Sequence, residues 1–307
     1  MSRDAAAGWT PADMPDLSGR RALVTGVTSG IGERTALELA RHGAEVVLAA
    51  RSETRLARAE ADILAAVPGA VLHHAIVDLA DLSSVRRAAA GVAELGPLDL
   101  LVNNAGVMAL PYARTVDGFE LQFGTNHLGP FLLTGLLLPC LAESGNGRVV
   151  TVASQAHRFA RRAPLEDPRS TSGRYSRWGA YGGSKLANLM FTFELDRRAG
   201  AAGLPVRALA AHPGYSATEL VGKTGGLGGQ IMTAATRLLG QRSDLGALPT
   251  LMAATADLPG STYVGPDGLF QLRGYPRIVA PRRLALDQQA QRRLWELSEA
   301  ATGIHYP

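Results

Sequence analysis

A tyrosine and a lysine four positions apart could together transfer a proton. Tyr181 and Lys185 occur in the run Tyr-Gly-Gly-Ser-Lys, and Lys185 is one of only two lysines in 307 residues. On a helix, residues i and i+4 share one face, with Cβ atoms about 5–6 Å apart. An ammonium at that distance favours the phenolate and moves the tyrosine pKa from about 10 toward the working pH. The spacing therefore predicts that Tyr181 acts as a general acid or base.

Two further polar residues could assist this chemistry. Ser154 ends the apolar run that begins at Val150, and its hydroxyl could hydrogen-bond a substrate oxygen as charge develops there. Asn126 opens a long apolar segment. An asparagine at that position is also typical of a helix cap or kink, so both interpretations of Asn126 are open.

A glycine-rich turn lies between an apolar run and an amphipathic one. Its candidate cofactor contacts are Gly26, Thr28, Ser29, Gly30, Ile31 and Gly32. Glycine lets backbone N–H groups and the positive end of the following helix approach a pyrophosphate, where a Cβ would obstruct contact. The pattern predicts a dinucleotide site, and the alternative is that these glycines only end a strand.

The end of the second strand-like run bears on the choice of cofactor. NAD enzymes usually place an acid there to bind the ribose 2′-hydroxyl. In this chain Ala50 takes that position and Arg51 follows. Because a guanidinium forms bidentate, charge-assisted bonds with phosphate, we expect NADP(H) in preference to NAD(H). In the competing interpretation Arg51 points to solvent and Glu53 binds the ribose.

Strand-like and helix-like segments alternate along most of the chain. Strands are expected at 21–26, 45–50, 71–77, 98–103, 148–153 and 206–211, and helices at 33–42, 53–66, 83–95, after Asn126, and at 181–198. This alternation requires right-handed crossovers and a parallel sheet covered on both faces. We expect an α/β, Rossmann-like, doubly wound and mostly parallel seven-stranded sheet. It would form a single domain of residues 20–307 after an extension of residues 1–19, with ligands at the carboxyl ends of the strands.

These motifs, in this order, resemble the short-chain dehydrogenase/reductase superfamily from about Arg20 onward. Segments 126–134 and 184–188 and the insert 155–180 look closest to the branch that contains retinol dehydrogenases, WW-domain oxidoreductases and protochlorophyllide reductases. The resemblance implies a catalytic tetrad of Asn126, Ser154, Tyr181 and Lys185. It also implies that Asn126 holds a water molecule and that Lys185 binds the nicotinamide ribose.

The same resemblance assigns further cofactor contacts. The matched positions are Asp78 and Leu79 for the adenine, Asn104, Ala105 and Gly106 for the adenosine ribose, and Pro213, Gly214 and Thr218 for the nicotinamide carboxamide. Asn104 could equally tie strands together, and a proline-glycine turn after a strand is common.

Two segments depart from the alternation and are expected to form the walls and lid of the substrate site. They are the insert 155–180, which holds six arginines, and the glycine-rich loop 215–245. The arginines could form an anion-binding lid or a solvated loop, and we favour the solvated loop. Phe159, Tyr175 and Trp178 are then the residues expected to touch substrate, although Trp178 could instead anchor the insert. A pocket role and a packing role are equally open for His157.

Composition argues against several other classes of protein. The single cysteine, Cys140, offers no disulfide framework or cysteine metal site, and no histidine has partners at metal-ligand spacing. A net charge of +4, with basic residues spread among acidic ones, does not favour nucleic-acid binding. The first twenty residues lack an apolar leader, and the apolar stretch 131–142 is too short to span a bilayer. We therefore expect a cytoplasmic protein without a membrane span, and the pattern leaves room for a homo-oligomer.

Together these features favour an NADP(H)-dependent carbonyl reductase or alcohol dehydrogenase whose substrate is a small, hydrophobic carbonyl or alcohol. One alternative is a cofactor-binding regulator or scaffold on the same fold, although such a protein would be expected to lack part of the tetrad. Another is an epimerase or lyase of the extended group. Its glycine turn normally has two residues between the first glycines, whereas three separate Gly26 from Gly30 here.

Overall fold

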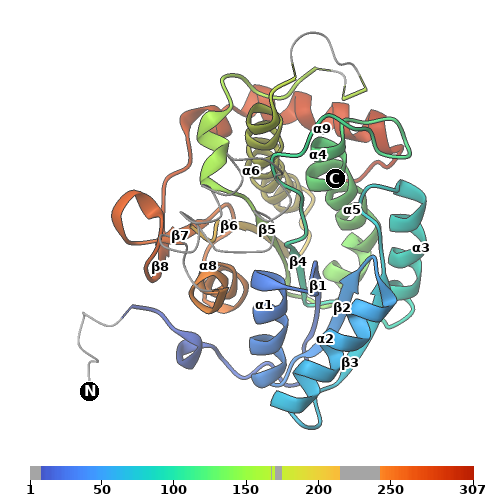
Figure 1. The fold of residues 1–307 in the computed structure, drawn as a ribbon, viewed down its shortest axis with the longest axis vertical. Helices are drawn as coiled ribbons and strands as arrows, with labels where there is room; N and C mark the ends of the chain where they lie inside the picture. Colours follow the sequence, from blue (N-terminus) through green and yellow to red (C-terminus); the bar gives the residue numbers. More distant parts are fainter. Residues whose placement is uncertain (1–7, 167, 170–174, 215–242) are drawn as a thin grey trace.

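The computed structural model describes residues 8–166, 168–169, 175–214 and 243–307. Its described strands form one sheet in the order β3-β2-β1-β4-β5-β6-β7-β8 (Figure 1). Their bounds are β1 Arg21–Thr25, β2 Glu45–Ala50, β3 Leu72–Ile76, β4 Leu100–Asn103, β5 Gly147–Val152, β6 Val206–Ala211, β7 Tyr263–Pro266 and β8 Pro276–Ile278. The pairs from β3 to β7 are parallel, whereas β8 is antiparallel to β7.

The expected mostly parallel, doubly wound α/β sheet is confirmed, but it has eight strands in the described part of the chain instead of seven. The extra strand, β8, is only three residues long and lies at the edge of the sheet. Its last residue, Ile278, is 58% exposed. Such a short, half-solvated segment has no apolar run by which the sequence could indicate a strand.

Helices cover both faces of the sheet. The longer ones are α1 Gly30–Arg41, α2 Glu53–Ala66, α3 Leu82–Ala93, α5 Gly129–Glu143, α6 Arg177–Ala201, α8 Ser243–Thr255 and α9 Gln288–Thr302. The short ones are η1 Pro11–Asp13, α4 Leu121–Phe123, η2 Gly124–Leu128, η3 Gln155–Phe159, η5 Leu269–Gln271 and η6 Arg283–Leu286.

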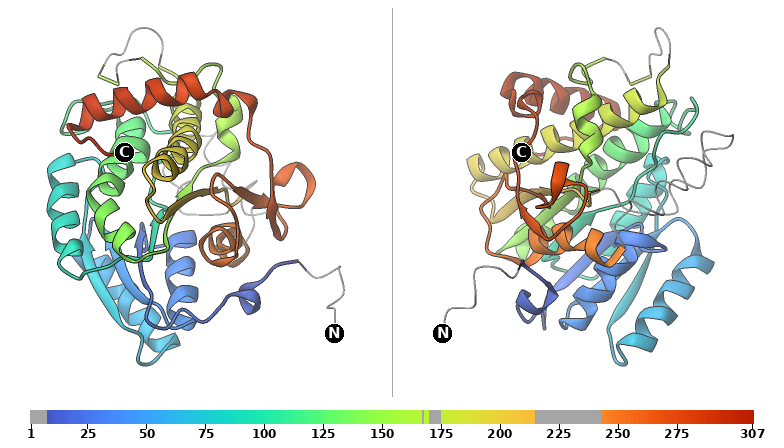
Figure 2. Two further views of the ribbon diagram at one scale, coloured as in Figure 1. Left: turned by 180° about the vertical axis from the view of Figure 1, so that it is seen from behind. Right: turned by 60° about the vertical axis from the view of Figure 1, so that its left-hand side comes forward.

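Successive strand residues face opposite helical layers, as the pleat of a strand requires. Val24 and Val102 pack against the layer of α1, α2 and α8. Leu23 and Leu101 pack against the layer of α3, α5 and α6. Both faces of the sheet are therefore buried, which explains why the sequences of the central strands are continuously apolar. Helix α9 crosses α6 (Figure 2), where the Arg198 guanidinium lies 4.6 Å from the centre of the Trp295 ring.

The apolar helix after Asn126 is longer than the sequence indicated, because α4, η2 and α5 run on without a break. Within the described residues, Leu121–Glu143 is one helix of 23 residues that is apolar enough, by length and composition alone, to cross a membrane. In this fold 78% of its apolar window is buried, and α5 packs against α3 and the sheet. Buried core helices share this composition, so the absence of a membrane span stays a prediction. Cys140, in the last turns of α5, is 9% exposed.

Candidate active site

Helix α6 begins at Arg177, one turn earlier than the sequence indicated, and presents Tyr181 beside Ser154. The Ser176 side chain caps the helix by accepting a hydrogen bond from the Gly179 N–H, 3.1 Å away. Tyr181 is buried, with 8% of its surface exposed. A hydrogen bond between Tyr181 and Ser154 favours the phenolate, but burial has the larger effect and raises the pKa of Tyr181.

The direction of this pKa shift is opposite to the one expected from the Tyr-x-x-x-Lys spacing. The Lys185 Nζ atom lies 5.9 Å from the centre of the Tyr181 ring and donates a hydrogen bond to the Val152 carbonyl, 2.8 Å away. The ammonium is thus directed at the end of β5. Burial lowers the pKa of Lys185 from 10.5 to about 8. In the absence of ligand, Tyr181 is therefore held as the neutral phenol.

Asn126 lies in η2, a π-helical turn between α4 and α5, and it is fully buried. Its Oδ1 accepts from the Val107 N–H at 2.7 Å. Its Nδ2 donates to the Val107 carbonyl and to the Ser184 Oγ, each 2.9 Å away. The helix irregularity expected as one alternative is present, and π turns are frequent at functional sites. Asn126 thus connects Val107 to Ser184 of α6, between Tyr181 and Lys185 in the sequence.

Gly106, in the turn after β4, lies between two members of the tetrad, Asn126 and Lys185. A Cβ at Gly106 would lie 3.0 Å from the Asn126 Oδ1 and 3.5 Å from the Lys185 Nζ. The backbone of the turn after β4 therefore lies close to both side chains, and it leaves little room for a side chain at Gly106. The structure gathers Asn126, Ser154, Tyr181 and Lys185 at the carboxyl ends of β4 and β5.

The glycine turn forms a cradle that fits a dinucleotide pyrophosphate. Gly26 and Gly30 have φ angles of 75° and 63°, in the region that favours glycine. A Cβ at Gly32 would clash with the Gly26 carbonyl and with the Asn104 side chain. Helix α1 begins at Gly30, earlier than the expected Glu33, so its free N–H groups face the turn. The backbone geometry therefore requires glycine at these positions, and pyrophosphate binding at this turn stays a prediction.

Thr25, which the sequence analysis did not single out, holds the turn after β4 in place. Its Oγ1 accepts hydrogen bonds from the N–H groups of Asn104 and Ala105, both at 3.0 Å. The Asn104 Nδ2 donates to the Thr25 carbonyl at 2.8 Å. Asn104 therefore ties β1 to β4, as one interpretation held, and its contact with a ribose stays a prediction. A threonine ending a buried strand is too common to signal this role.

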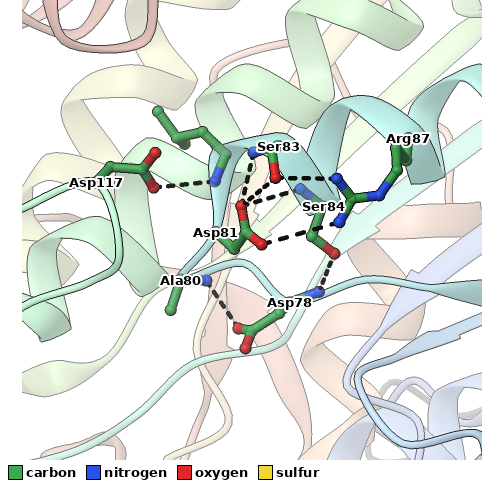
Figure 3. Close-up of polar contacts among 8 residues, drawn as sticks. Asp78, Ala80, Asp81, Ser83, Ser84, Arg87 and Asp117 are labelled. Atoms are coloured by element: carbon green, nitrogen blue, oxygen red, sulfur yellow. Dashed lines mark hydrogen bonds and ion pairs between the residues drawn. The ribbon is translucent and has the colours of Figure 1, made fainter.

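Asp78 follows β3, half-buried, in a loop stabilised by its own hydrogen bonds (Figure 3). Its Oδ1 accepts from the Ala80 N–H at 2.9 Å, and its own N–H donates to the Ser84 Oγ at 3.0 Å. The next acid, Asp81, caps α3 by accepting from the Ser83 and Ser84 N–H groups. These bonds fix the Asp78 carboxylate at the end of β3, and its contact with an adenine stays a prediction. Leu79 is 5% exposed, so its side chain belongs to the core.

Arg51 stands exposed immediately after β2, and in the described part of the chain its guanidinium forms no ion pair. Ser52, the next residue, caps α2 by accepting from the Arg55 N–H at 3.4 Å. Glu53 lies exposed in the first turn of α2. Either Arg51 or Glu53 could therefore approach a cofactor ribose from this position.

The proline-glycine turn after β6 is also tightly packed. Gly214 has a φ angle of 71°, and a Cβ there would clash with the Leu272 carbonyl. Its N–H donates to the His212 Nδ1 at 3.2 Å. Pro213 precedes it, whereas Thr218 and residues 215–242 of the expected loop 215–245 lie outside the described residues.

Aromatic residues of the insert extend away from Tyr181. The Trp178 ring meets the Tyr181 ring edge-on at 6.0 Å and the Phe159 ring at 6.5 Å. Tyr175 has a different role, because its OH donates to the Glu120 Oε1 at 2.8 Å and accepts from the Gln122 Nε2 at 2.7 Å. Tyr175 thus fastens the insert to α4, and only Phe159 and Trp178 remain exposed candidates for substrate contact.

The polar members of the insert are mostly engaged with the protein itself. His157 is fully buried and packs on the Tyr263 ring, which supports its packing role. Arg158 donates to the Gln155 Oε1 at 2.9 Å, and the Arg169 guanidinium lies 4.2 Å from the centre of the Phe119 ring. Arg162 pairs with the exposed Glu166. Arg174 lies outside the described residues.

Comparisons with known proteins agree with this fold. Residues 20–164 match a family described as short chain dehydrogenase. The chain is 38% identical to retinol dehydrogenase 13 of Homo sapiens over 100% of its own length and 92% of that protein. It is 42% identical to polyprenol dehydrogenase of Mus musculus, covering 96% of this chain and 87% of that one. A solved structure of an uncharacterized protein from Mycobacterium Paratuberculosis shares 47% identity with a TM-score of 0.81, covering 98% and 100% of the two chains.

The chain therefore belongs to the short-chain dehydrogenase family, in a branch resembling the retinol dehydrogenases. Members of this family bind NAD(P) and convert small molecules. The protein is accordingly a dehydrogenase or reductase that acts on alcohol or carbonyl groups.

Proposed function

We propose that the protein is an NADP(H)-dependent reductase or dehydrogenase of hydrophobic carbonyl or alcohol substrates, with Tyr181 as the general acid or base. The observation that carries this proposal is the placement of the buried Tyr181 beside Ser154 and one helical turn from the buried Lys185, whose Nζ lies 5.9 Å from the centre of the Tyr181 ring. Buried proton donors beside a charge partner are typical of catalytic sites.

In the direction of reduction, a nicotinamide cofactor held at the glycine turn of Gly26, Gly30 and Gly32 would supply the hydride for the carbonyl carbon. Ser154 and Tyr181 hydrogen-bond the carbonyl oxygen, and the Tyr181 phenol gives its proton to that oxygen as the hydride arrives. The phenolate that remains is stabilised by the Lys185 ammonium. Burial raises the pKa of Tyr181, so the phenol carries the proton needed for this step at neutral pH.

Three observations support the finer parts of the proposal. Phe159 and Trp178 offer exposed aromatic surface next to Tyr181, which suits an apolar substrate. Relatives named for retinol and polyprenol agree with this class of substrate. Arg51, without an ion pair among the described residues, is free to receive a 2′-phosphate.

The test is an absorbance assay of NADPH oxidation with a panel of aliphatic and aromatic aldehydes and ketones. We expect NADPH oxidation with the apolar members, and slower oxidation of NADH under the same conditions. Failure to oxidise either nicotinamide with every member of the panel would refute the proposed activity.

A further inference from the structure

The loop that joins β7 to β8 is held in an unfavourable backbone conformation. Phe270 and Gln271 are consecutive non-glycine residues with φ angles of 52° and 56°. Such residues persist in the left-handed region only where the surrounding structure fixes them, and they cluster at ligand sites. The loop projects from the β7–β8 edge of the sheet (Figure 1).

The Gln271 side chain connects this loop to the ends of neighbouring strands. Its Oε1 accepts hydrogen bonds from the His212 Nε2, 3.1 Å away, and from the Gln155 Nε2. Gln155 directly follows Ser154, and His212 directly precedes Pro213. One amide oxygen therefore connects the loop to the carboxyl ends of both β5 and β6.

The hydrogen bonds of His212 define its protonation state. The Gly214 N–H donates to the Nδ1, so the ring proton lies on the Nε2 and is donated to Gln271. Burial lowers the pKa of His212 to about 3, and the ring stays neutral. The chain from Gln271 to Gly214 is thus a set of directed hydrogen bonds that a charged imidazole would interrupt.

Backbone packing adds to this attachment. The Leu272 carbonyl lies so close to Gly214 that a Cβ there would clash with it. The His212 ring lies just as close to Gly265 in β7. The loop therefore abuts the turn expected to hold the nicotinamide, with no space between them for a side chain.

The apolar side chains on either side of Gln271 are directed into solvent. Leu269 and Phe270 are each 78% exposed, and Leu272 is 43% exposed. These large apolar side chains are exposed to water beside the ends of β5 and β6. Contact with an apolar ligand would remove their surface from water and would therefore be favourable.

We propose that the β7–β8 loop is a wall of the substrate site, in which Gln271 positions the ends of β5 and β6 and Phe270, with Leu269, contacts the apolar part of a long-chain alcohol or aldehyde. This inference rests on the proposed function and names its substrate class. The reacting carbon lies at Tyr181 and Ser154, and the chain beyond it extends over the loop.

The first test is the dependence of kcat/KM on substrate length, measured with butanal, hexanal, octanal and decanal. In the unmodified protein kcat/KM should rise along the series, by up to roughly fourfold for each buried methylene. Phe270→Ser should lower the ratio of decanal to butanal kcat/KM by roughly tenfold or more. Val71→Ser is the matched control, because Val71 is 55% exposed and precedes β3 at the opposite end of the strands.

The second test concerns Gln271. Gln271→Leu removes the acceptor at nearly constant size, so kcat should fall and the NADPH dissociation constant should rise together, because both strand ends lose their connection. Gln271→Glu keeps the acceptor oxygen and should restore both values. If Gln271 serves stability alone, Gln271→Leu will lower the melting temperature with both values unchanged, which would overturn its positioning role.

These experiments test the role of the β7–β8 loop and the proposed function separately. If the unmodified protein reduces aldehydes but Phe270→Ser keeps the same chain-length dependence, the wall is refuted and the function stands. If no aldehyde is reduced, the function fails, and NADPH binding by Gln271→Leu still decides whether Gln271 positions the strand ends.

Discussion

The proposed proton transfer depends on which charges the buried residues of this site can carry. Burial raises the pKa of Tyr181 and lowers that of Lys185 to about 8. The identity of both residues could be predicted from their spacing, since i and i+4 fix proximity on a helix. The sign of the tyrosine shift could not, because desolvation depends on how the whole core closes over the ring.

The first prediction tests Tyr181 as proton donor. Tyr181→Phe keeps the shape of the ring and removes its proton, so kcat should fall by roughly a hundred- to ten-thousandfold. The NADPH dissociation constant, measured by fluorescence titration, should stay within about twofold. Undiminished turnover would show that another group supplies the proton.

The second prediction concerns the cofactor phosphate. Arg51→Asp replaces an attractive charge by a repulsive one, so the ratio of kcat/KM for NADPH over NADH should fall by roughly ten- to a hundredfold. Arg58→Asp makes the same charge change on the exposed face of α2 and should leave the ratio nearly unchanged. An equal ratio in both variants would place Arg51 away from the phosphate.

At the scale of elements, the glycine turn yields a paired prediction. Gly32→Ala adds a Cβ that clashes with the Gly26 carbonyl, which should cost about 1–3 kcal/mol of unfolding free energy and weaken NADPH binding. Gly91→Ala in α3 meets nothing within 4 Å and should raise stability by up to about 1 kcal/mol. Chemical denaturation and NADPH titration check both. Equal effects of the two changes would contradict the close packing.

Elements with strong local signals were predicted with correct ends, and others were not. Strands β2 and β6 and helix α2 match their expected ranges, because apolar blocks and the Ser52 cap define them. The π turn at Asn126 was not predictable as such, since no local pattern distinguishes it from an α-helical turn. No pattern in the sequence predicts the short, exposed strand β8.

For the molecule as a whole, three buried histidines should make the free energy of unfolding depend on pH. Burial lowers the pKa values of His127 and His212 to about 3 and of His157 to about 4, from 6.5. Below pH 6.5 the unfolded chain therefore binds more protons than the folded one, and stability is lost as pH falls. Each histidine should contribute about 1.4 kcal/mol per pH unit between pH 6 and 5.

Urea titrations at pH 7 and pH 5 measure this loss. His305→Gln is the control, because it removes an imidazole whose side chain is 79% exposed and keeps all three buried rings, so the loss of stability between pH 7 and pH 5 should persist. An unfolding free energy that is equal at both pH values would contradict the neutral, buried state of the three rings.

The contacts that sequence reasoning missed are those between distant segments. Gln271 lies 116 residues from Gln155 and 59 from His212, yet it bonds to both. No local pattern connects three ordinary polar residues over such separations. The proximity of the four tetrad residues and the position of the glycine turn could be predicted, because each is a short motif at the end of a strand, where a parallel sheet gathers its ligands. Their catalytic and cofactor-binding roles stay predictions.

The reactivity of Cys140 can report local opening of the protein around α5. It is the single cysteine, it lies buried in α5, and burial raises the pKa of its thiol. Modification by a maleimide then requires α5 to separate from its neighbours, so the labelling rate reports the population of that opened form without any engineered label. Comparing this rate with and without NADPH would show how far cofactor binding restrains the layer of helices that backs the catalytic strands.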